Sequence, residues 1–415
     1  VVMARGKDFK DAVLAYQYSS PPLSILERAF LDKFWSNVVH LYPMWLAPNV
    51  ITLMGYACVW VAVYLILSNS PALEGTCDSW VYLVSSVLVF FYQTLDGSDG
   101  KQARRTKSGS ALGELMDHGV DAVVTTLLPF MTADTFGYGI SSLWPWTFAL
   151  AAQVAFCLSN MTLVHSGCQK FFELDCMEIQ WSLILILAFG GLFGPEFFTS
   201  TTFPIPPQMS WIKTDFFGLL RPDEIVDLTS GRIELKIVLI IAGLGGCITN
   251  MFVYLFYCLA PYIFPTEKQK EHLRKTGYTI SILFVHVLRS WGQLFLSYSA
   301  ILLSRNNIAG DDRKHGALRA LLFVSSFSFA DLMDRILMLR VAREPLAWIP
   351  TGFYPLMAFS VLAKFDSQIG ELPVEWFNVL VVVQVIIHHS YFISSVLDLA
   401  RVLRVHPLKV GKLKD

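Results

Sequence analysis

Residues 95–121 read LDGSDGKQARRTKSGSALGELMDHGVD, with four aspartates in a very apolar chain. Asp96 and Asp99 are three residues apart, and Asp117 and Asp121 are four residues apart. In helices these spacings place each pair on one face, so two helix ends that face each other bring the four carboxylates together. Unpaired carboxylates are costly beside a membrane, and a cluster of oxygen ligands suits a hard divalent cation such as Mg²⁺ or Mn²⁺. The stretch therefore predicts a metal site between two helices.

The composition predicts an integral membrane protein. Of the 415 residues, 54% are hydrophobic and only 16% are charged, whereas about a quarter are charged in soluble domains. A formal net charge of −1 argues against nucleic acid as the main partner. The seven cysteines lack CxxC or Cys/His spacing, which indicates free thiols rather than disulfides or a zinc site. No cleavable signal peptide precedes the first apolar run, so a membrane helix is expected to act as the targeting signal.

Ten apolar segments are long enough to cross a bilayer, which takes ~17–25 helical residues. They lie at about 49–68, 80–98, 118–138, 143–164, 179–199, 234–264, 279–304, 317–339, 346–365 and 376–400. The even number places both ends of the chain on one side. Basic residues are more frequent in the loops on the side of the motif, although the loop 305–319 goes against this trend. The bias predicts that the motif and both termini face the cytosol.

A shorter amphipathic helix is predicted before the first span. Ser24 and Glu27 form a capping-box pattern, and apolar residues then recur every three or four positions, at Leu26, Phe30, Phe34, Val38 and Leu41. The charged residues between them make the segment too polar to span, so we expect it to lie in the membrane interface.

The motif also supports a resemblance to a known family. The pattern Asp96-x-x-Asp99-Gly100-x-x-Ala103-Arg104, then Gly113-x-x-x-Asp117-x-x-x-Asp121, resembles the signature of the CDP-alcohol phosphotransferases at every position. The segments LDGSDGKQARRT and LGELMDHG are similar to those of the eukaryotic choline/ethanolamine phosphotransferase branch. The resemblance implies an all-α membrane fold with a six-helix catalytic bundle over 49–265. A four-helix extension over 266–415 would follow it, and an N-terminal segment, 1–48, would precede it.

The family resemblance implies a reaction. Phosphocholine or phosphoethanolamine would pass from CDP-choline or CDP-ethanolamine to the hydroxyl of diacylglycerol, with release of CMP. Two Mg²⁺ or Mn²⁺ ions, held by Asp96, Asp99, Asp117 and Asp121, would clamp the entering and leaving oxygens. The resemblance further implies a homodimer in an endoplasmic reticulum or Golgi membrane, with the active site facing the cytosol. The choice between choline and ethanolamine is left open.

Several residues around the aspartates are candidates for substrate binding. Gly100, Ala103 and Gly113 allow a nucleotide or a neighbouring helix to come close, and the guanidinium of Arg104 can fork onto a phosphate. Lys101, Arg105 and Lys107 either add to this contact or are ordinary positive charge flanking a span. Asn49 and Thr52 match the family's Pro-Asn-x-x-Thr motif, which is associated with the nucleotide pocket. Taken alone, Asn49 would be interpreted as a helix N-cap.

A general base must take the proton of the acceptor hydroxyl. Glu114, Asp117, His118 and Asp121 share one helix face by their spacing, and His118 has a suitable intrinsic pKa. We expect His118 to be the base, with Glu114 orienting it as in the eukaryotic branch. Asp121 is the alternative, although binding to a metal would weaken it as a base.

Other polar residues in apolar surroundings are given less specific interpretations. His165, Asp175, Glu178 and Gln180 either line the cytosolic entrance or are ordinary interfacial residues. Structural pairing or cavity lining is expected of His286, Arg289, Asp331, Asp334 and Arg335, with an ion pair between Asp331 and Arg335. Packing is expected of His388 and His389, and the sequon at Asn160 is expected to be unused.

Two other classes of protein remain as alternatives. A polytopic transporter would also carry intramembrane carboxylates, but it would need no Asp-Gly-x-x-Ala-Arg spacing and should have two related halves with interrupted helices. A non-catalytic scaffold is expected to have lost part of the motif. Within the enzyme class, phosphatidylinositol and phosphatidylglycerophosphate synthases share the motif, but they are typically about half this length.

Overall fold

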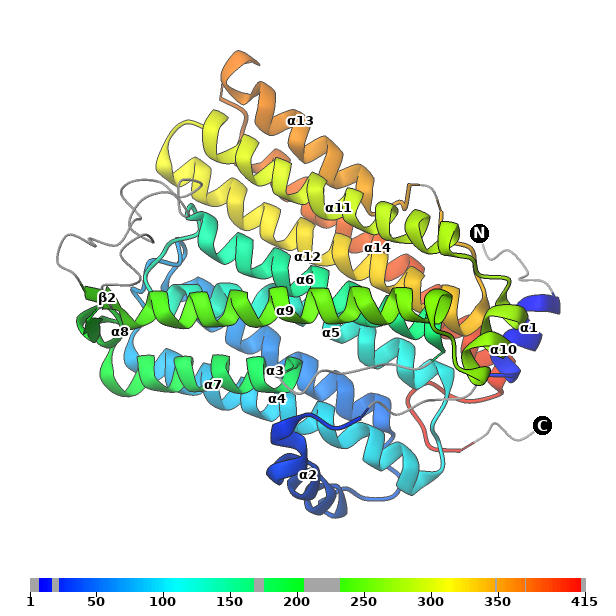
Figure 1. Cartoon of the computed structure of the whole chain (residues 1–415). Coiled ribbons are helices and arrows are strands. Elements are labelled where there is room, and N and C mark those ends of the chain that lie inside the picture. The colour runs from blue at the N-terminus through cyan, green and yellow to red at the C-terminus, as the bar shows by residue number, and fades with distance from the viewer. Residues whose placement is uncertain are drawn as a thin grey trace.

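The computed structural model describes residues 7–16, 22–167, 175–204, 232–347, 349–369 and 371–411. Long helices run side by side through the molecule (Figure 1). They are α3 (Pro48–Asn69), α4 (Ser79–Thr106), α5 (Ala111–Thr135), α6 (Leu143–Ser166), α7 (Cys176–Phe193), α9 (Leu235–Ile263), α11 (Ile280–Asn307), α12 (Asp311–Ala342), α13 (Phe353–Ile369) and α14 (Val374–Leu403). Each overlaps one predicted span, which confirms the all-α class.

Seven of these described helices are long and apolar enough to cross a membrane. The others are α4, α5 and α13. The first two carry the charges of the motif, and α13 has only 17 residues. The integral-membrane class is therefore confirmed, while the count of ten spans stays a prediction.

The remaining described elements are short. They are α1 (Lys7–Leu14), η1 (Glu27–Leu31), α2 (Asp32–Val38), η2 (Val39–Leu41), α8 (Glu196–Ser200), β1 (Thr202–Pro204), β2 (Arg232–Glu234) and α10 (Glu267–Thr276). β1 and β2 pair antiparallel, with Phe203 opposite Ile233. In Figure 1, α1, α10 and the last turn of α14 lie at the same end of the bundle as the turn between α4 and α5.

The predicted amphipathic helix is present as η1, α2 and η2. Its capping box is confirmed, because the Ser24 N–H donates to Glu27 Oε2 at 2.7 Å and the Glu27 N–H donates to Ser24 Oγ at 3.4 Å. Burial raises the pKa of the Glu27 carboxyl. Trp35 is buried against α4, where a Cβ on Gly97 would lie 2.4 Å from its ring. Of the predicted stripe, Phe30, Phe34 and Leu41 are exposed, whereas Leu26 and Val38 are half-buried.

Helix α12 forms the centre of the packing. It contacts α5, α6, α11, α13 and α14, and 89% of its most apolar 18-residue stretch is buried. One hydrophobic core includes residues from both predicted parts of the chain, such as Val123 of α5 and Met333 of α12. Helices on both sides of residue 265 thus share one core, while the boundary at 265 between bundle and extension stays a prediction.

The turn that joins α4 and α5 presents the motif. α4 ends at Thr106 because Lys107 adopts the left-handed conformation, with φ of 55°. α5 begins at Ala111, and the N-cap Ser110 accepts a hydrogen bond on Oγ from the Gly113 N–H at 3.4 Å. Both halves of the motif are therefore helical, as the aspartate spacing predicts.

Candidate metal and catalytic site

Three of the four motif aspartates form a compact cluster. One carboxylate oxygen each of Asp96, Asp99 and Asp117 lies within 4.8 Å of the other two. Asp121 lies outside this set, but its carboxylate is close enough to Asp96 for electrostatic interaction. Asp99 is buried and the other three are partly exposed. The two helix ends thus bring the carboxylates together and leave them accessible.

The cluster fits a divalent cation. Asp96 Oδ1 is buried and has no hydrogen-bond partner among the described residues, and three carboxylates this close repel each other without a counter-charge. The only donors are oxygens, the set that hard cations such as Mg²⁺ prefer. Asp99 is held in place by the Thr52 hydroxyl, which donates to its Oδ2. An ion bound here would supply both the missing partner and the missing charge.

Tyr92 is a site residue that the sequence interpretation missed. Its hydroxyl donates to Asp121 Oδ1 at 2.5 Å and so fixes the fourth aspartate. The sequence spacing could have indicated it, since Tyr92 precedes Asp96 by four residues and so lies on the same face of α4.

Asn49 and Thr52 both lie at the site, but Asn49 is not a helix N-cap. The N-cap of α3 is Ala47, and Pro48 takes the first helical position, which its fixed φ favours. The Asn49 side chain instead donates to the carbonyl of Pro407 at 2.7 Å. A Cβ on Gly113 would lie 3.6 Å from Asn49 Oδ1, so the start of α3 adjoins the start of α5.

The basic residues of the motif divide into two groups. The side chain of Lys101 pairs with Asp32 and donates to Ser36 Oγ at 3.0 Å, while Arg105 donates to the Tyr42 carbonyl at 2.7 Å. Both therefore hold the interfacial segment against α4. The exposed side chain of Arg104 makes no hydrogen bond within the described residues, and its Nη1 lies 3.7 Å from a Cβ built on Gly100. Lys107 is exposed as well, so Arg104 and Lys107 are the basic residues of the stretch that are available to a phosphate.

The predicted pairing of Glu114 with His118 is not present. His118 Nδ1 lies 2.9 Å from Asn160 Oδ1 of α6, and Glu114 forms an ion pair with Arg340 of α12. Although the four-residue spacing places both side chains on one face of α5, partners on two different neighbouring helices turn them apart. The His118 ring still lies within electrostatic reach of Asp121.

His165 does not line an entrance. It is fully buried, with Nδ1 2.6 Å from the Tyr262 hydroxyl and Nε2 3.2 Å from His286 Nδ1. Asp175 caps α7, and Glu178 accepts a hydrogen bond from the Leu26 N–H at 2.9 Å. Asp175 and Glu178 therefore lie together at the start of α7, whereas His165 is buried in a different environment.

The predicted ion pair in α12 is confirmed. Arg335 donates to Asp331 Oδ2 at 2.9 Å and to Oδ1 at 3.1 Å. Asp334, one turn along the same helix, lies 3.4 Å from His388 Nδ1. His388 therefore has an acidic neighbour, which its own surroundings in the sequence did not indicate.

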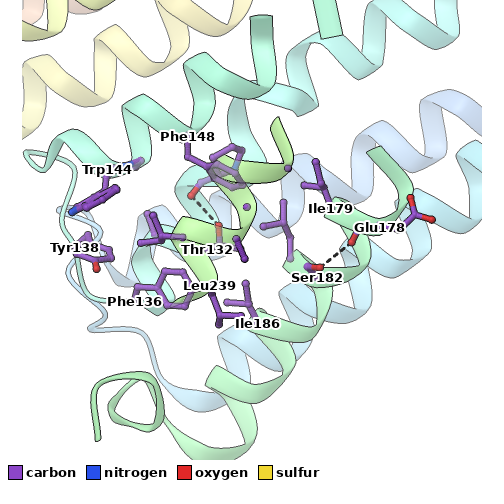
Figure 2. A pocket seen from close by; sticks show the side chains of 18 of the residues that line it. Thr132, Phe136, Tyr138, Trp144, Phe148, Glu178, Ile179, Ser182, Ile186 and Leu239 are labelled. Atoms are coloured by element: carbon purple, nitrogen blue, oxygen red, sulfur yellow. Dashed lines mark hydrogen bonds between the residues drawn. The ribbon is translucent and has the colours of Figure 1, made fainter. Parts of the chain in front are cut away.

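A largely apolar cavity of about 260 Å³ lies between α5, α6, α7 and α9 (Figure 2). Figure 2 labels Phe136, Trp144, Phe148 and Ile186 among the side chains around it, with Glu178 near one edge. Asp175 and Glu178 at the start of α7 line it. The cavity thus lies in the apolar interior, with two carboxylates at the start of α7 among its lining residues.

The fold and site define a class: an all-helical integral membrane protein with a carboxylate cluster suited to a divalent cation. A family model described as CDP-alcohol phosphatidyltransferase matches residues 45–200, which contain all four aspartates. Residues 45–200 therefore correspond to a CDP-alcohol phosphatidyltransferase domain.

Named relatives agree with this assignment. The "uncharacterized CDP-alcohol phosphatidyltransferase class-I family protein 3" of Dictyostelium discoideum is 27% identical over 410 residues, which cover 95% of this chain and 94% of that protein. Cholinephosphotransferase 1 of Bos taurus is 25% identical over 95% of this chain and 87% of its own length. Choline/ethanolaminephosphotransferase 1 of Saccharomyces cerevisiae is 40% identical over 31% of this chain and 32% of its own length. Neither the site nor these relatives favour the transporter alternative.

Proposed function

We propose that the protein transfers phosphocholine, phosphoethanolamine or both from a CDP-alcohol to diacylglycerol, with release of CMP. The cluster of Asp96, Asp99 and Asp117, presented by a complete family motif, carries the proposal. The names of the relatives support this choice of phosphoalcohol.

In this proposal the aspartates hold Mg²⁺ or Mn²⁺, with two ions expected. A bound ion would neutralise the pyrophosphate of the CDP-alcohol and the charge that develops on CMP. Arg104 approaches the pyrophosphate as the available cation of the motif. Thr52 and Tyr92 keep Asp99 and Asp121 oriented, so that substrate binding requires little rearrangement of the carboxylates.

His118 is proposed as the general base. The acceptor oxygen attacks the phosphorus that carries the alcohol, the bond from this phosphorus to the CMP oxygen breaks, and the hydroxyl proton moves to His118. Asp121 is the less suited acceptor, because its Oδ1 already accepts a hydrogen bond from Tyr92 and its carboxylate lies close to Asp96. Glu114, paired with Arg340, supports the start of α5 rather than the base.

The cavity of Figure 2 is the proposed place for the apolar part of diacylglycerol. Its walls are largely apolar, as burial of hydrocarbon requires, and Asp175 and Glu178 at the start of α7 add polar groups to its lining. A lipid hydroxyl can then approach the carboxylates while its chains stay out of water.

We further propose that the active site faces the cytosol from an endoplasmic reticulum or Golgi membrane, and that the protein is a homodimer. The basic residues near the motif support this orientation, as does the position of α1 and the end of α14 at the same end of the bundle (Figure 1).

Product analysis tests the proposed function. Purified protein in lipid nanodiscs is given diacylglycerol, Mg²⁺ and either CDP-choline or CDP-ethanolamine, and the lipids are identified by mass spectrometry. We expect a phospholipid and an equal amount of CMP from at least one donor, and none with Asp117→Ala. Absence of product from both donors, or undiminished transfer in excess EDTA, refutes the proposal.

A further inference from the structure

The hydrogen bond between His118 and Asn160 determines more than the position of the ring. Asn160 is 1% exposed, and its side chain makes two bonds: Oδ1 lies 2.9 Å from His118 Nδ1, and Nδ2 donates to the Phe156 carbonyl at 2.9 Å. The ring of Phe156, one helical turn before Asn160, packs beside the imidazole with centroids 6.3 Å apart. α6 thus supplies both a polar and an apolar contact to this histidine.

The second bond of Asn160 fixes the orientation of its amide. The Phe156 carbonyl can only accept, so the amide group that faces it is the NH₂. The atom that faces His118 is therefore the amide oxygen, which can only accept as well. His118 Nδ1 must then carry a hydrogen, and in the neutral ring Nε2 is left without one.

We propose that Asn160 is a positioning residue that holds His118 in the tautomer with a free Nε2, ready to accept the proton of the acceptor hydroxyl. This inference rests on the proposed function, in which His118 is the base. It assigns to Asn160 the role that the sequence interpretation gave to Glu114. Glu114 does not serve this role here, since its carboxylate is paired with Arg340.

The first test compares two buried amides on the same helix. Asn160→Leu removes the acceptor and keeps a similar volume. The matched control, Gln153→Leu, removes another buried bond between α6 and α5, in which Gln153 Nε2 donates to Thr126 Oγ1 at 2.7 Å. We expect Asn160→Leu to lower kcat roughly 10- to 100-fold, the usual cost of removing such a supporting partner, with the KM for CDP-alcohol retained. Gln153→Leu should keep the wild-type kcat.

Asn160→Asp provides a rescue test. Its carboxylate still accepts from His118 Nδ1–H, so we expect most of the kcat lost in Asn160→Leu to return. Equal losses in the Asp and Leu variants, or equal losses in Asn160→Leu and Gln153→Leu, overturn the proposal in favour of a structural role for Asn160.

A double-mutant cycle shows whether Asn160 acts through His118. In a His118→Ala background, adding Asn160→Leu should cause only a small further decrease in kcat. Additive losses would mean that Asn160 acts independently of the histidine. If His118→Ala alone is as active as the wild type, the histidine is not the base, and the proposed mechanism fails at that step rather than at Asn160.

Solid-state NMR gives a readout that does not depend on activity. With ¹⁵N-labelled histidine, the resonances of His118 are those absent from the His118→Ala spectrum. We expect a protonated Nδ1 and an unprotonated Nε2 in the neutral ring, and loss of this single tautomer in Asn160→Leu. A protonated Nε2 with a bare Nδ1 in the wild type refutes the assignment.

Discussion

Replacing Gly97 by alanine should disturb the interfacial helix and the site together. A Cβ at this position would lie 2.4–2.6 Å from three atoms of the Trp35 indole, closer than any tolerated contact. Trp35 is only 3% exposed and α2 packs against α4, so the ring cannot move aside without displacing the helix. Overpacking of this kind costs about 1–3 kcal/mol.

The helix propensity of alanine works in the opposite direction. Replacing glycine by alanine inside a helix raises the free energy of unfolding by about 1 kcal/mol. The net destabilisation at Gly97 is therefore the cost of the clash minus this gain. Gly292 in the middle of α11 is the matched control, because a Cβ there would have nothing within 4 Å. We expect Gly292→Ala to raise the apparent melting temperature slightly and Gly97→Ala to lower it.

Displacement of α2 should also lower activity. Lys101 and Arg105 contact this segment from α4, and Gly97 lies between Asp96 and Asp99. Thermal unfolding and transfer activity of both variants in the same nanodiscs provide the measurement, with Gly97→Ala/Trp35→Leu as the rescue. If Gly97→Ala is as stable as Gly292→Ala and fully active, Trp35 does not hold the interfacial helix against α4 as described.

Further predictions concern the cation, the base, the ion pair and the interfacial helix. Mg²⁺ at 100 times its dissociation constant should stabilise the wild type by about 2.7 kcal/mol but not Asp117→Ala; an equal thermal shift in both would remove Asp117 from the metal site. His118→Ala should lose roughly 10²-fold or more in turnover while CDP-alcohol binding, measured directly, is retained; lost binding would point to a substrate-binding role. Asp331→Ala removes the buried ion-pair partner of the partly buried Arg335, which keeps its hydrogen bond to Thr351, and should lower the melting temperature. Because burial raises the pKa of Glu27 in the folded state, the protonated carboxyl stabilises the fold at low pH, and this stabilisation should be lost as the pH rises through the folded pKa. The melting temperature of Glu27→Gln should lack this pH dependence.

The sequence predicted those parts of the site that depend on local spacing. Asp96 and Asp99 share a face of α4, and Asp331 pairs with Arg335, because residues three or four apart on a helix are neighbours whatever the surrounding fold is. The capping box of the interfacial helix is local in the same sense. These features require only that the segment be helical.

The partners contributed by other helices could not be predicted in this way. Spacing places Glu114 and His118 on one face but does not say which helices they meet, and these turn out to be α12 and α6. Nothing in the sequence indicated that Asn160 contacts His118, because a buried asparagine in an apolar span is consistent with many partners. His388 likewise meets an aspartate that is 54 positions away, which only tertiary packing brings within 3.4 Å.

These long-range contacts change the role of the last third of the chain. The resemblance implies a catalytic bundle followed by an extension, yet polar groups of the extension contact residues of the site directly. Arg340 of α12 pairs with Glu114, and the Pro407 carbonyl accepts from Asn49 at the start of α3. Both contacts support helix ends that carry site residues, and a buried ion pair is costly to break from either side. Arg340→Ala should therefore impair transfer although Arg340 belongs to the extension, which makes α12 part of the scaffold that holds the active site.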